Sequence, residues 1–138
     1  MYTIKEIQDF VAKQIGVNTN EVTPDCEIYK DLACYGDDFH DFIEAYSTTF
    51  NVEMRKYLWY FHTPEEGNSS IGALFFRAPN ERVSHIPVTP LLLQEFANKG
   101  YWDVSYPEHK LPKRRYDLLI NKLILALFIV YLFYMCTR

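Results

Sequence analysis

Apolar residues recur every three or four positions near the start of the chain: Ile4, Ile7, Val11 and Ile15. This spacing predicts an amphipathic helix over residues 4–15. Thr3 and Glu6 match the capping box of a helix start, and Gly16 matches a helix end. The chain is therefore expected to begin with one helix that buries a stripe of its surface.

A second helical pattern follows a polar segment. Residues 17–32 are rich in Asn, Thr, Asp and Pro, and they predict an ordered loop with three core-facing side chains: Val17, Val22 and Ile28. Apolar residues then return at helical spacing: Phe39, Phe42, Ile43, Tyr46 and Phe50. They predict a helix over residues 38–50, capped by Asp37 or Asp38. A short third helix is expected over residues 54–61.

The pattern changes in the second half of the chain. After a polar linker, residues 71–77 and 82–88 have the composition of two short strands joined by a turn, which predicts a β-hairpin. Thr89 and Pro90 then mark the start of a helix that Gly100 ends. The side chains expected to be buried here are Leu92, Leu93, Phe96, Ala97, Tyr101 and Trp102.

The most apolar segment of the chain is residues 118–136, interrupted only by Asn121 and Lys122. A membrane span needs roughly 20 mostly apolar residues, so the segment predicts a transmembrane helix with Lys122 reaching the headgroups. Residues 123–136 would also fit the buried core helix of a soluble domain. The segment is apolar on every face, however, and this favours the membrane.

Charge and cysteine content suggest where the chain lies. The formal net charge is −4, with most acidic residues in positions 1–66. A basic cluster precedes the apolar segment and is expected to lie at the membrane interface with Lys122: Lys113, Arg114 and Arg115. The positive-inside rule then places the N-terminal part in the cytoplasm. Three unpaired cysteines and the lack of a secretory signal at the start agree with reduced thiols there: Cys26, Cys34 and Cys136.

The run from Ile15 to Leu32, with its Gly-Val, Glu-Val-Thr and Asp-Leu elements, resembles the first loop of acyl carrier proteins. The likeness continues to residues 50–54, Phe-Asn-Val-Glu-Met, and covers about residues 3–61. It implies a helical bundle of that family, whose phosphopantetheine serine position is occupied here by Gly36. Because glycine has no hydroxyl to phosphorylate, no cofactor is expected. The chain also resembles a small uncharacterised enterobacterial family related to that fold.

Acyl carrier proteins present an acidic second helix to basic enzyme surfaces, and the resemblance carries this role to Asp38 and Asp41. Asp37 and Glu44 extend the negative stripe by helical spacing. Carboxylates near a helix start also simply stabilise the helix, so a solvated face is the alternative. The spacing fits neither a calcium loop nor a zinc site, and no nucleophile motif or phosphate loop is present. Cys34 lies near Asp31 and Asp37, so its thiol pKa is expected to be raised rather than lowered.

These observations predict a mainly α protein: an acyl-carrier-like bundle over residues 1–66, a hairpin-plus-helix extension packed on it over 67–108, a basic neck over 109–117 and the transmembrane helix. We expect a non-enzymatic adaptor or regulatory protein on the bacterial inner membrane, single-pass, which docks a protein with a basic surface. Nucleic acid, metal and a small-molecule substrate are not expected. Two alternatives stay open: a carrier with non-standard attachment, and an accessory subunit in which Asn121 and Lys122 contact other helices.

Overall fold

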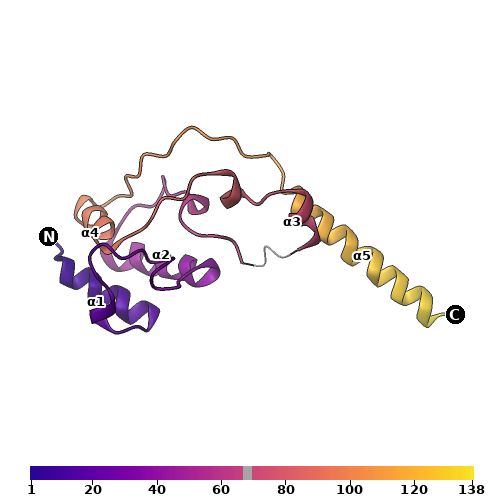
Figure 1. Ribbon diagram of the computed structural model, residues 1–138, viewed down its shortest axis with the longest axis horizontal. Coiled ribbons are helices and arrows are strands. Elements are labelled where there is room, and N and C mark those ends of the chain that lie inside the picture. The colour runs from indigo at the N-terminus through magenta and orange to yellow at the C-terminus, as the bar shows by residue number, and fades with distance from the viewer. Residues whose placement is uncertain (67–69) are drawn as a thin grey trace.

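The computed structural model describes residues 1–66 and 70–138, and these residues form a mainly helical protein (Figure 1). The α-helices are α1 (Ile4–Ile15), α2 (Gly36–Phe50), α3 (Ile71–Phe75), α4 (Pro90–Lys99) and α5 (Tyr116–Cys136). Three short 3₁₀ turns are η1 (Thr19–Glu21), η2 (Trp59–Phe61) and η3 (Pro79–Arg82). Over the described range there is no β-strand, and a single parallel bridge joins Glu53 to Tyr101.

Helices α1 and α4 have the bounds and the caps that the sequence predicts. Both halves of the Thr3–Glu6 capping box are present at the start of α1, and Gly16 ends that helix. At the start of α4, the Thr89 hydroxyl accepts a hydrogen bond from the Leu92 backbone at 3.2 Å, and Gly100 ends it. Each cap satisfies a backbone donor or acceptor that the helix itself leaves unpaired, so local sequence is sufficient to define these ends.

Helix α2 begins earlier than the sequence predicts, and its predicted cap is wrong. The residue before it is Tyr35, which makes no side-chain capping bond, and Asp37 and Asp38 lie inside the first turn. The five apolar residues predicted for its buried face are all buried. The carboxylates therefore favour the helix through its dipole rather than by capping.

The core lies between α1, α2 and α4 and is closed by loop side chains. Val22 and Ile28 from the predicted loop are buried, and Val17 packs at the edge. The Tyr46 hydroxyl donates to the Leu93 carbonyl at 2.6 Å, which ties α2 to α4 in the interior. Trp102 is buried as predicted, whereas Tyr101 is exposed, because successive side chains of an extended segment point to opposite sides.

The predicted third helix over residues 54–61 is wrong: only the single turn η2 forms there. The backbone on either side is already engaged with distant segments. Glu53 donates to the Gly100 carbonyl at 2.9 Å and accepts from Trp102 at 2.8 Å. The Leu58 amide donates to the Tyr106 hydroxyl at 3.1 Å. These long-range hydrogen bonds use backbone groups that a helix would pair within its own segment.

The predicted β-hairpin is also wrong, because its two segments pair with other parts of the chain. Residues 71–75 form α3, and the Ser70 hydroxyl accepts a hydrogen bond from the Ala73 amide. In the second segment, Ile86 donates to Phe61 at 2.7 Å, and Ile28 donates to Val88 at 3.0 Å. The strand-like composition of these segments was thus overridden by tertiary contacts.

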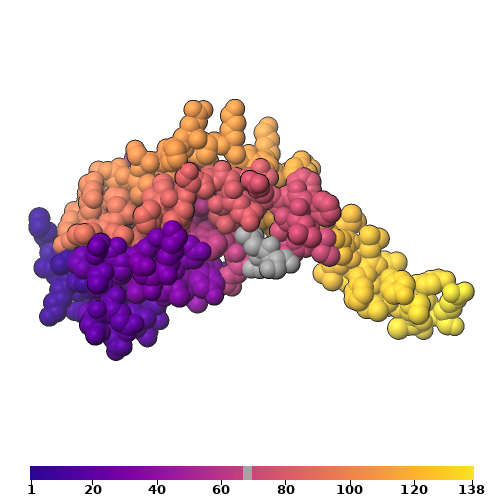
Figure 2. All heavy atoms as spheres, in the orientation of Figure 1, coloured from indigo at the N-terminus to yellow at the C-terminus, as the bar shows by residue number. Residues whose placement is uncertain are grey.

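Helix α5 is long and apolar enough to cross a membrane, and none of its most apolar window is buried against the rest of the protein. The alternative of a buried core helix is therefore wrong for this structure. Figure 1 shows α5 extending away from α1, α2 and α4, with α3 beside its first turns, and Figure 2 shows its atoms projecting beyond the body of the molecule. The non-helical segment 103–115, from here on called the neck, leads from α4 to α5 along the head. The head is residues 1–66 and 78–102, without α3. The last two residues of the predicted basic neck, 116 and 117, belong to α5.

Candidate functional site

The four carboxylates predicted to bind a partner lie together on the exposed side of α2. We call them the acidic face: Asp37, Asp38, Asp41 and Glu44. The opposite side of the helix is buried in the core. Within residues 1–66 and 70–138, no cation forms an ion pair with any of these four side chains. The acidic face is thus a set of unneutralised charges held on a rigid element.

A hollow of about 380 Å³ lies beside the acidic face, between the end of α1 and the start of α2. Asp38 and Asp41 line it, and so do apolar side chains from three segments: Ile15, Val17, Leu32 and Phe42. The exposed lining is mainly polar, with a smaller apolar part. Carboxylates beside a small apolar surface suit a lysine or arginine, which has a hydrocarbon stem and a charged end. The sequence predicted the carboxylates but not the hollow, because its walls come from separate parts of the chain.

Gly36 cannot take a side chain without strain at the position of the absent serine. Its φ of +59° lies in the left-handed region, which is costly for any residue with a Cβ atom. A Cβ atom built there would overlap the side chain of Glu66. The Gly36 amide also donates to the Thr63 hydroxyl at 3.2 Å. A serine here would therefore have to displace Glu66 and accept an unfavourable backbone.

Cys34 has the raised thiol pKa that the sequence predicts, although for a different reason. Burial, with a smaller contribution from the nearby Asp38 carboxylate, raises the pKa to about 11. The carboxylates expected to act, those of Asp31 and Asp37, do not contribute. A buried thiol that stays protonated is a poor nucleophile, so Cys34 belongs to the core.

A buried polar cluster around His62 was missed by the sequence analysis. His62 Nδ1 lies 2.9 Å from the Ile86 carbonyl, so it donates, and Nε2 then accepts from the Tyr106 hydroxyl at 2.8 Å. The Tyr106 oxygen in turn accepts from Trp102 Nε1 at 2.9 Å. The ring of Tyr57 stacks on His62. Burial lowers the pKa of His62 to about 4, so the ring is neutral and holds the neck on the head.

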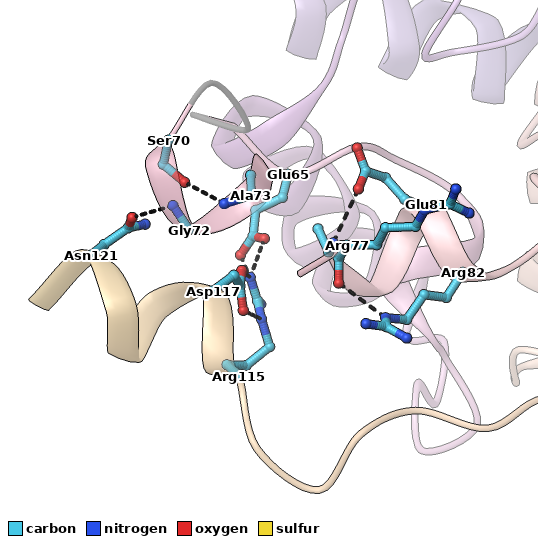
Figure 3. A network of polar contacts seen from close by, with 11 residues as sticks. Glu65, Ser70, Gly72, Ala73, Arg77, Glu81, Arg82, Arg115, Asp117 and Asn121 are labelled. Atoms are coloured by element: carbon cyan, nitrogen blue, oxygen red, sulfur yellow. Dashed lines mark hydrogen bonds and ion pairs between the residues drawn. The ribbon is translucent and has the colours of Figure 1, made fainter. Parts of the chain in front are cut away.

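The basic residues predicted for the membrane interface divide into two kinds. Arg115 bonds to Glu65 at 2.7 and 3.1 Å and to Asp117 at 2.9 Å, as Figure 3 shows. It therefore joins the head to α5 rather than projecting freely. Three others are exposed: Lys113, Arg114 and Lys122.

Helix α3 packs tightly on the first turns of α5. The Gly72 amide donates to the Asn121 side-chain oxygen at 2.8 Å (Figure 3). A Cβ atom on Gly72 would overlap the Asp117 carbonyl, so only glycine allows this approach. Asn121, expected either at the interface or against another helix, thus has a partner within the chain. We call α3, the end of the neck and the first turns of α5 the junction.

In the part of the chain that the structure describes, no group of three His, Cys, Asp or Glu side chains is arranged to hold a metal ion. Comparison with known proteins gives a family but no function. No curated protein and no solved structure matches the chain. The resemblance to acyl carrier proteins thus stays a prediction, with no support from these comparisons. Residues 1–104 match the sequence profile of one family, and the chain belongs to that family, which is described as "Protein of unknown function (DUF1493)".

Proposed function

We propose that this protein is a non-enzymatic, membrane-anchored adaptor that docks a basic protein through the acidic face. The observation that carries the proposal is the pairing of unneutralised carboxylates with the adjacent hollow. The hollow admits one lysine or arginine side chain of a partner, while Asp37 and Glu44 attract the surrounding positive surface. Charge complementarity of this kind contributes mainly to specificity and association rate.

The anchor in this proposal is α5, which crosses the bacterial inner membrane once. Its apolar surface is exposed on all sides of the helix. The exposed Lys113 and Arg114 precede it, so the positive-inside rule favours a cytoplasmic head. Held in this way, the acidic face would meet partners at the membrane surface.

The acyl-carrier resemblance enters as part of this proposal, in which the head keeps a carrier-like docking helix without the carrier reaction. The geometry around Gly36 supports this version over a working carrier, because position 36 has no hydroxyl and a left-handed backbone that is costly for serine. Intact-mass measurement on protein from its native host tests the point. We expect no phosphopantetheine adduct, and an adduct on any residue would contradict the proposal.

Charge reversal tests the docking surface directly. The full chain is captured from detergent-solubilised host membranes, and the retained proteins are quantified. The double substitution Asp38→Lys with Asp41→Lys should reduce capture of a specific basic partner at least about tenfold, since close charge pairs contribute several kcal/mol at interfaces. The control is Asp9→Lys with Asp25→Lys, which makes the same change of charge at exposed sites away from α2. Equal capture by wild type and the α2 variant would contradict docking through this face.

A further inference from the structure

Helix α3 carries large apolar side chains that the protein does not cover. Leu74 is 81% exposed, Phe75 is 71% exposed and Ile71 is 51% exposed. Three such residues on a helix of five cannot be explained as scattered surface positions. Helix α3, which carries them, packs against α5, and the space-filling view shows its segment beside the base of that helix (Figure 2).

The junction fixes the depth of α3 relative to α5. The 21 residues of α5 span about 31 Å, close to the roughly 30 Å of a bilayer's hydrocarbon core. The first turns of α5 therefore coincide with one boundary of that core. Gly72 bonds to Asn121 and contacts Asp117, so α3 is held at the same boundary. The ion pair of Arg115 with Glu65 also connects the start of α5 to the head.

A small basic hollow opens beside α3, at the same level. It measures about 120 Å³, and its walls are mostly apolar. Four arginines and one carboxylate also line it: Arg77, Arg82, Arg114, Arg115 and Asp117. Arg115 is neutralised by its ion pairs, whereas no described carboxylate pairs with the other three. Arg82 donates to the Arg77 carbonyl at 3.0 Å, which orients its guanidinium. The hollow is too small for a drug-sized ligand, which needs at least about 300 Å³.

We infer that α3 and this hollow together form a binding site for an anionic phospholipid in the leaflet next to the head. Leu74 and Phe75 insert among the acyl chains near the headgroups, and the guanidinium groups of Arg77, Arg82 and Arg114 bind the lipid phosphate. Continuity with α5 favours lipid over a protein partner as the occupant. The inference rests on the anchor of the proposed function, because α3 reaches this depth only if α5 spans the bilayer.

Depth-dependent quenching tests the insertion of α3 and separates it from the anchor. The full chain carries Cys136→Ser and a fluorescent label at Leu74→Cys, Leu91→Cys or Phe128→Cys, and is reconstituted in phosphatidylcholine and phosphatidylglycerol vesicles. Leu91 is the matched control, because it is a half-exposed leucine on α4. A nitroxide near the headgroups should quench position 74 several-fold more than position 91. A nitroxide deep in the bilayer should quench position 128.

The outcomes distinguish the two claims. If position 128 is quenched while position 74 behaves like position 91, the anchor stands and the lipid site is overturned, leaving the face of α3 to a protein partner. If position 128 is not quenched either, both the anchor and the lipid site fail.

Lipid retention tests the arginines. Native mass spectrometry of the full chain in detergent compares phosphatidylglycerol, phosphatidylcholine and inorganic phosphate as probes. Phosphatidylglycerol should bind best, and Arg77→Gln with Arg114→Gln should weaken its binding about tenfold or more. The control Lys5→Gln with Lys13→Gln removes the same charge from α1 and should bind as wild type does. Equal binding of the two lipids, or binding of inorganic phosphate without preference for the lipid, would overturn the site.

Discussion

The head and the junction treat apolar side chains in opposite ways. In the head, α1, α2 and α4 enclose residues such as Phe39 and Leu93, which are almost completely buried. At the junction, polar groups such as Asp117 are buried while Leu74 and Phe75 face outward. The head buries its apolar side chains, as a protein in water does, whereas the junction exposes them. This difference suits a chain that contacts both water and lipid. The contrast supports the proposed membrane anchor.

The largest expected effect comes from removing a core ring. Phe39→Ala should lower the free energy of unfolding of the head by about 3–5 kcal/mol, because it leaves a cavity in a packed interior. Phe75→Ala, which removes the same ring from an exposed site, should change it by less than about 0.5 kcal/mol. Urea unfolding of the full chain in mild detergent, followed by tryptophan fluorescence, measures both. Similar losses of stability from the two substitutions would contradict the difference in burial between the head and the junction.

The second effect is a pH dependence of the stability of the head, caused by His62. Burial lowers the pKa of this ring to about 4 in the folded head, whereas the unfolded chain binds the proton near 6.5. Stability from the neutral ring is therefore fully present above about pH 6.5 and is lost as the pH falls toward 4. The total loss is about 3 kcal/mol. His62→Gln should remove this part of the slope, so parallel stability curves for wild type and variant would contradict the assignment.

The third effect concerns the junction. Gly72→Ala introduces a methyl group where the Asp117 carbonyl lies, and it should destabilise the α3–α5 contact by about 1–3 kcal/mol. Amide hydrogen exchange should accelerate at Ala73 and Phe76 and stay unchanged in α4. Leu74→Ala is the control, since its side chain touches little. Faster exchange in α4 as well would mean that the junction and the head unfold together.

The smallest effect belongs to the acidic face. Asp38→Asn with Asp41→Asn should lower the stability of the head by less than about 1 kcal/mol, because only favourable interactions with the α2 dipole are lost. Thermal unfolding measures it. A large loss would show that these carboxylates are structural, and capture experiments with substitutions on this face would then need reinterpretation.

Local signals in the sequence were enough for the head's helices but not for the junction. Thr3, Thr89 and the glycines after α1 and α4 act within a few residues of the ends that they define. The fate of residues 71–77 depended instead on Asn121, about fifty positions away. The local composition of residues 71–77 contains no information about a hydrogen-bond partner so distant in the sequence.

The candidate site divides in the same way. Helical spacing was sufficient to predict that Asp37, Asp41 and Glu44 share one side of α2, whereas Asp38 was carried over from the resemblance to acyl carrier proteins. The hollow beside it depends on how Val17 and Leu32 return to that helix, and the His62 cluster depends on Tyr106, 44 residues away. The clustering of aromatic residues at 57–62 and 101–106 was the one signal for the His62 cluster. It does not specify which side chains form hydrogen bonds with each other.

Alkaline carbonate extraction of host membranes tests the central claim that the chain folds its head in water and embeds α5 in a bilayer. The full-length protein, detected in the washed pellet and in the supernatant, should remain in the pellet. Recovery of the folded protein in the carbonate supernatant would contradict the account.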